Sequence, residues 1–99
     1  MLVIRNTFQL KFGKAKEAVA SLKEAFAAQK KAGSSFGYRI LTDMTGPFYT
    51  LVLEVTAPNM AAMEAEMPRN MSMPEFQAAY QRFVPLVESG ERQIFAIVE

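Results

Sequence analysis

Hydrophobic and polar residues alternate along the first part of the chain, over residues 2–12. One side of the alternation carries Leu2, Ile4, Phe8, Leu10 and Phe12, and the other carries Arg5, Thr7, Gln9 and Lys11. Successive side chains of a β-strand point to opposite faces, so this pattern predicts a strand with one apolar face.

The spacing of the apolar residues lengthens after Gly13. Steps of four, three and four residues connect Ala15, Val19, Leu22 and Phe26, with charged residues between them. This spacing predicts an amphipathic helix of about five turns that begins near Lys14. Gly33 is suited to end it, because glycine readily adopts the left-handed conformation that follows many helices.

A β-hairpin is predicted over residues 36–56. Segments 36–43 and 48–56 are rich in aromatic and β-branched residues, and Thr45-Gly46-Pro47 between them is typical of a short loop. In the register expected for such a loop, Arg39 pairs with Val52. One face then holds Tyr38, Ile40, Thr42, Tyr49, Leu51, Leu53 and Val55, and the other holds Arg39, Leu41, Asp43, Phe48, Thr50, Val52 and Glu54. The first face is apolar enough to pack against helices, and the second mixes charged with hydrophobic residues.

A short helix is predicted to follow the hairpin, from Pro58-Asn59 to Pro68. Five methionines crowd the region from this helix to residue 73, and Met60, Met63 and Met67 share one helical stripe. These methionines either pack in the ordinary way under a broken helix or form an adaptable wall for an apolar ligand.

A second helix is predicted to begin at Ser72, which forms a capping box with Glu75. Its buried stripe is expected to hold Phe76, Ala79, Tyr80, Phe83 and Val87. Pro85 predicts a kink near its end, Gly90 predicts its stop, and residues 92–98 are expected to form the last strand.

The order of these elements is β-α-β-β-α-β, which predicts an α+β, ferredoxin-like fold formed by one domain over residues 1–99. Right-handed crossovers leave a gap between the first two strands that the third can fill. The expected antiparallel four-stranded sheet therefore has the order 4-1-3-2, with the helices on one face. The other face would expose a large apolar surface to water, so we expect two copies to pair through it and form a dimeric α/β barrel.

Composition narrows the possible functions. Of the 99 residues 51% are hydrophobic, the net charge is +1, and there is no Cys and no His. A near-neutral charge argues against nucleic acid as a partner. Without Cys and His the chain lacks the usual ligands of zinc and haem and the residues of Ser-His and Cys-His catalytic dyads. We therefore expect no metal, no cofactor and no catalytic dyad of these kinds. Without a signal-peptide core or an apolar run of roughly 18 residues, we expect a cytoplasmic protein that does not contact membranes.

Two stretches resemble a known family. GYRILTDMTGPFYTLVLEV (37–55) and PEFQAAYQRFVPLVESGERQIF (74–95) are similar to NIPSNAP-type proteins of the dimeric α/β-barrel superfamily, which also holds cofactor-free monooxygenases and small-molecule isomerases. The resemblance implies a dimeric barrel with a cleft between sheet and helices. It implies no catalytic residues. The chain also lacks the His that several enzymatic branches use, and it is one unit rather than a tandem pair.

Six residues are candidates for lining a ligand cleft. Arg5, Arg39 and Glu54 share one predicted sheet face, where they either grip an anionic ligand or satisfy one another at a dimer interface. Asp43 and Tyr49 flank the hairpin turn. They can act as a general base with a hydroxyl donor, or Asp43 can bond its own turn.

Tyr80 is the sixth candidate. It lies on the apolar stripe of the last helix, and its hydroxyl can turn toward a cleft. The default for an aromatic residue at this spacing is a place in the core.

Three functions remain open, and whether the protein is an enzyme is not decided by its sequence. The first is a small-molecule-binding protein with a largely apolar cleft. The second is a cofactor-independent monooxygenase or isomerase for an aromatic or polyketide-like substrate, and the third is a structural or regulatory homodimer without a ligand. A filled cleft favours the third, an open and uniformly apolar cleft the first, and an open cleft with an arginine and an acidic group the second.

Overall fold

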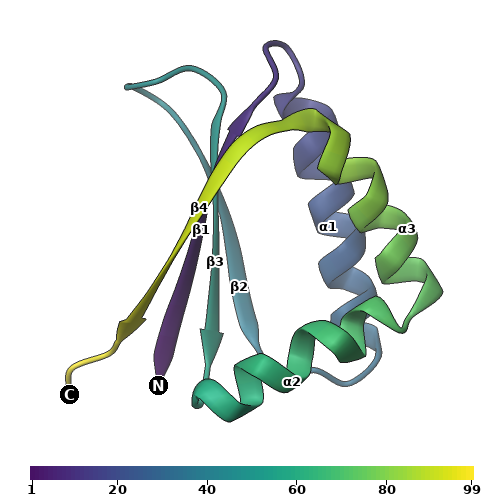
Figure 1. Cartoon of the computed structure of the whole chain (residues 1–99), viewed down its shortest axis with the longest axis vertical. Coiled ribbons are helices and arrows are strands. Elements are labelled where there is room, and N and C mark those ends of the chain that lie inside the picture. The colour runs from purple at the N-terminus through teal and green to yellow at the C-terminus, as the bar shows by residue number, and fades with distance from the viewer.

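The computed structural model describes all residues from 1 to 99. Its elements are β1 (Leu2–Leu10), α1 (Ala15–Lys31), β2 (Gly37–Thr42), β3 (Thr50–Ala57), α2 (Met60–Met71), α3 (Pro74–Phe83), the 3₁₀ turn η1 (Val84–Leu86) and β4 (Val87–Ala96). The antiparallel sheet has the order β2-β3-β1-β4, which is the predicted 4-1-3-2 order counted from the other edge. All three helices lie on one side of the sheet, and the ferredoxin-like prediction is confirmed (Figure 1).

The hydrophobic core lies between the helices and the sheet face that they cover, called here the inner face. Its largest fully buried side chains come from α1, β3 and α3, and they are Leu22, Leu51, Phe76 and Phe83. Burial of such a side chain contributes about 1.5–3 kcal/mol. The inner face of β3 is the face predicted to pack against helices.

The hairpin register differs from the prediction by two residues. Arg39 lies opposite Glu54, whereas the prediction placed it opposite Val52. The loop takes in residues 43–49 and includes two positive φ angles, at Gly46 and Tyr49, so it is longer than the turn assumed. A shift of two keeps every side chain on its face, and the predicted division of the faces is therefore correct.

Pro68 does not end α2, contrary to the prediction. The helix continues to Met71, and Ser72 lies at its C-terminal end, where the hydroxyl donates to the carbonyl of Arg69 at 2.6 Å. The carbonyl that loses its amide partner to Pro68 belongs to the exposed Glu64, where water can bind it. Because Ser72 caps the preceding helix, the predicted capping box does not form, and Met73 occupies the N-cap of α3.

The last helix ends at Phe83 rather than at Gly90. Pro85 lies in the 3₁₀ turn, and β4 begins at Val87, so Gly90 is a strand residue. Gly90 lies opposite Phe8, and a Cβ at Gly90 would lie 3.0 Å from the Phe8 ring. The glycine thus leaves room for this ring, which packs edge-on against Phe83 with centroids 5.0 Å apart.

No helix covers the outer face of the sheet. Leu41 and Phe95 are 39% and 42% exposed there, and Phe95 lies opposite Val3. Phe48, in the hairpin loop, is 73% exposed. No helix is long and apolar enough to cross a membrane.

Replacing Phe83 with alanine should be strongly destabilising. Phe83 is 1% exposed and contacts Phe8, so its loss leaves a cavity and should cost about 3–5 kcal/mol. Urea unfolding measures this, with Phe12→Ala as the control. Phe12 is 78% exposed, and its substitution should cost less than about 1 kcal/mol. Equal losses for both variants would place Phe83 outside the core.

Candidate functional site

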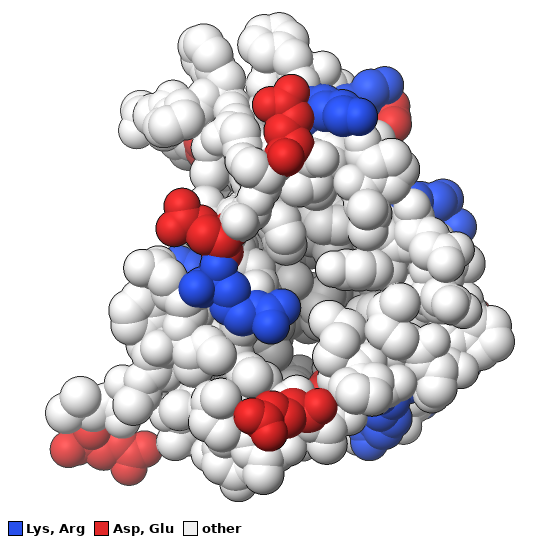
Figure 2. Space-filling view, in the orientation of Figure 1, with Lys and Arg blue, Asp and Glu red and all other residues white.

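A cleft opens between the inner face of the sheet and the helices. Its volume is about 290 Å³, and 11 of its 17 lining residues are hydrophobic. Figure 2 shows the surface hollowed between the two layers. The wall on the helix side includes Phe26, Met63, Met67, Phe76 and Tyr80. This cleft has the usual composition of a ligand site, which is apolar with a few polar groups.

Asn6 and Arg92 supply polar groups on the sheet side. They lie opposite each other on β1 and β4, and the Nε of Arg92 donates to Oδ1 of Asn6 at 2.8 Å. Asn6 lies between Ile4 and Phe8 on the inner-facing positions of β1, and all of these residues line the cleft. The strand pairing therefore brings a cation to the rim of an apolar cavity.

Gln29 and Asn70 supply polar groups on the helix side. Each is 3% exposed, and the carboxamide oxygen of each has no hydrogen-bond partner. A buried polar group without a partner costs about 1–3 kcal/mol. Asn70 is also the one buried residue of α2. Both oxygens are enclosed by protein atoms, so they are polar positions buried within the wall of the cleft.

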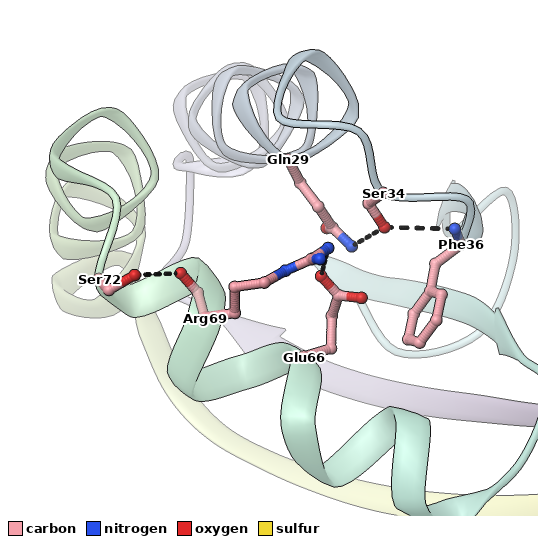
Figure 3. A network of polar contacts seen from close by, with 6 residues as sticks. All are labelled: Gln29, Ser34, Phe36, Glu66, Arg69 and Ser72. Atoms are coloured by element: carbon pink, nitrogen blue, oxygen red, sulfur yellow. Dashed lines mark hydrogen bonds and ion pairs between the residues drawn. The ribbon is translucent and has the colours of Figure 1, made fainter.

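A polar network closes the cleft beside Gln29 (Figure 3). The hydroxyl of Ser34 accepts from Nε2 of Gln29 at 3.0 Å and from the amide of Phe36 at 3.2 Å. On α2, Arg69 donates to Glu66 at 2.6 Å. These contacts tie the end of α1 to the segment before β2 and leave the oxygen of Gln29 unpaired.

The predicted charge cluster forms, but on the outer face of the sheet. Glu54 accepts hydrogen bonds from Nε of Arg5 and Nε of Arg39, each at 2.7 Å. Glu54 is 6% exposed, whereas the side chains of Arg5 and Arg39 are 42% and 68% exposed. The guanidinium of Arg5 also lies 5.2 Å from the centroid of the Phe95 ring. Each charged group has a partner, although two arginines share one carboxylate, and none of the three residues lines the cleft.

The two arginines change the acidity of Glu54. Hydrogen bonds from Arg39, and then from Arg5, hold the pKa of the Glu54 carboxyl below its usual value of 4.5. Glu54 is therefore ionised at neutral pH, and it does not serve as a proton donor.

Asp43 and Tyr49 lie at the far end of the hairpin, beside a second hollow of about 600 Å³. Asp43 Oδ1 accepts from the amide of Thr50 at 3.0 Å, the turn bond that was one of its two predicted roles. Tyr49 packs against Phe12 with ring centroids 4.6 Å apart. Phe12 and Phe48, which wall this hollow, are mostly exposed, so it is a poorer enclosure than the cleft.

Tyr80 is the one predicted candidate that lines the cleft. Residues missed from the sequence are Asn6, Gln29, Asn70 and Arg92. Asn6 lies two residues from both Ile4 and Phe8, so the alternation of β1 already indicated that this polar residue lies on the apolar inner face. Arg92 could not be assigned to a face before the start of β4 was known. No group of three or more acidic side chains gathers where it could hold a metal ion.

The sheet order and the helical layer on one side define the class as a ferredoxin-like α+β fold with a four-stranded antiparallel sheet. A NIPSNAP domain protein from Burkholderia xenovorans is 22% identical, with a TM-score of 0.84 over 99% of this chain and 95% of that chain. A NIPSNAP family protein from Agrobacterium tumefaciens is 19% identical, with a TM-score of 0.85 over 99% and 86%.

An antibiotic biosynthesis monooxygenase is 13% identical, with a TM-score of 0.75 over the full length of both chains. No protein-family model matches the sequence, and no curated protein matches it. The resemblance to NIPSNAP proteins is thus confirmed in the fold, at sequence identities that leave function open.

The pairing of Glu54 should make stability depend on pH. Its pKa is lower in the folded chain, so the stabilisation is present above about pH 4.5 and is lost as the pH falls through the folded value. Glu54→Gln should therefore lower the urea midpoint at pH 7 and differ less from the wild type as the solution is acidified. Glu88→Gln, in β4 and without an ion pair, is the control. A difference between Glu54→Gln and wild type that is constant with pH would contradict the linkage.

Proposed function

We propose that the protein binds a small molecule in the cleft between its sheet and its helices. The observation that carries this proposal is the cavity of about 290 Å³ with mostly hydrophobic walls. Its size is at the lower end of the range for ligand sites, about 300–1,000 Å³. The polar residues Asn6 and Arg92 among the lining residues support it, because a ligand site is usually apolar with a few polar groups.

A cofactor-independent enzyme acting on an aromatic or polyketide-like substrate is the second candidate. The specific observation in its favour is that Arg92 lines the same cavity as two acidic residues, Glu64 and Glu66, and as the hydroxyl-bearing Tyr80. The fold shared with an antibiotic biosynthesis monooxygenase is consistent with this function. A homodimer without a ligand is less well supported, since the cavity is open.

We also propose that two copies pair through the outer face of the sheet. Leu41, Val52 and Phe95 surround the Arg5–Glu54–Arg39 cluster there and are exposed or partly exposed. Burial of these side chains against a second copy removes apolar surface from water and shields the ion cluster. The cytoplasmic location stays a prediction, as does the absence of nucleic-acid partners.

Sedimentation tests the dimer. The wild type should sediment at roughly 22 kDa at micromolar concentration, twice the 11.1 kDa of one chain. Leu41→Arg places a second cation beside Arg39 and should produce a monomer. Val84→Arg adds the same charge at a site that is 53% exposed on the helical side, and it should remain a dimer. A wild-type chain that is monomeric would contradict the proposal.

Filling the cleft should abolish binding. The neutral aromatic probe 2-naphthamide should bind the wild type with a stoichiometry of one per chain by calorimetry. Met63→Trp replaces a flexible thioether chain with a bulky indole ring in the cleft wall and should remove this binding without loss of thermal stability. Met60→Trp is the matched control, because Met60 lies on the same helix but does not line the cleft.

Native mass spectrometry of gently purified protein should detect a retained small molecule in the wild type and in Met60→Trp, and none in Met63→Trp. A compound recovered with its mass changed after incubation would favour the enzyme. Probe binding that is unaffected by Met63→Trp would place the ligand elsewhere.

A further inference from the structure

We propose that the ligand of this cleft is an organic anion, held by Arg92 at the rim with its apolar body inside. This inference rests on the proposed function and adds the charge and orientation of the bound molecule. Its basis is the state of Arg92, which differs from that of every other arginine in the chain.

Four of the five arginines are paired with a glutamate. Arg5 and Arg39 pair with Glu54, Arg69 pairs with Glu66, and Arg82 pairs with Glu24. Arg92 forms no ion pair, although Glu64 and Glu66 line the same cavity. Its charge is therefore not cancelled within the chain.

The hydrogen bond from Arg92 to Asn6 positions the guanidinium without neutralising it. The bond uses Nε, at 2.8 Å, and Asn6 is uncharged. The two terminal nitrogens form no hydrogen bond within the chain, and they present the paired donors that bind a carboxylate side by side. Arg92 is exposed at the rim, so these donors are accessible to a molecule that enters the cleft.

The acidic residues of the cleft give the bound anion one orientation. Glu64 and Glu66 belong to α2, whereas Arg92 lies on β4. In Figure 2 basic side chains lie at the hollow on the sheet side, with acidic side chains directly beside them, and further acidic side chains lie over α2. Glu66 is already held by Arg69. Of the two, Glu64 is therefore the carboxylate left to repel an anion from α2, while Arg92 attracts the anion toward β4, which directs its apolar part toward aromatic residues such as Phe76 and Tyr80.

Two probes of nearly equal shape separate the contribution of charge to binding affinity from that of the apolar ring. 2-Naphthoate and 2-naphthamide differ in charge and share the bicyclic ring, and calorimetry gives the Kd of each. The wild type should bind 2-naphthoate about tenfold more tightly than 2-naphthamide, a ratio that corresponds to roughly 1.4 kcal/mol. In Arg92→Met this preference should disappear while 2-naphthamide binding is kept.

Arg82→Met is the matched control, because it removes the same charge from the outer surface of α3 and should keep the tenfold preference. Asn6→Asp is a second variant, which places a carboxylate against Arg92 and should also remove the preference. It keeps the inference testable if Arg92→Met fails to fold.

Equal binding of both probes by the wild type would overturn the inference and leave the cleft proposal standing. A preference for 2-naphthoate that survives in Arg92→Met would overturn the assignment to Arg92. Binding of neither probe would overturn the proposed function together with the inference.

Discussion

The pairing of β1 with β3 on one side and β4 on the other is the constraint on which the rest of the molecule depends. Because β1 is central, its alternation decides which residues face the helices and which face away. The side chains of Ile4 and Phe8 point from the inner face toward the helices, and Asn6 between them adds one polar group to the cleft. Arg5, one residue away, points to the outer face. The register then aligns Arg92 with Asn6 and Glu54 with Arg5.

Two sets of polar residues consequently lie on opposite sides of the sheet, the inner set including residues of the helices that cover it. In the outer set every charged group has a partner, since the buried carboxylate of Glu54 accepts from two arginines. The inner set is incomplete, because Gln29 and Asn70 have unpaired oxygens and Arg92 has no carboxylate. Arg92 is the member of this set that is exposed at the cleft, and it marks the proposed site.

The sequence was sufficient for the order of elements, because the period-two spacing in β1 and β3 and the helical spacing in α1 each match the element that forms. The buried face of α1 was predicted only in part, since Leu22 and Phe26 are buried whereas Ala15 and Val19 are partly exposed. The sequence was insufficient for the site, which depends on long-range register. The face of Arg92 depends on where β4 begins. Gly90 was predicted to end the last helix, but it lies in β4, where the absence of a Cβ leaves room for the Phe8 ring. The Arg39–Glu54 contact was predicted correctly because a register error of two preserves each face.

Helix α2 forms one wall of the cleft while burying a single residue, Asn70, whereas α1 buries six. Segments with few buried contacts detach at a lower free energy than the core does. Among the three helices α2 is therefore the one with the fewest buried residues to hold it in place, and slow amide exchange should be concentrated in α1 and the central strands.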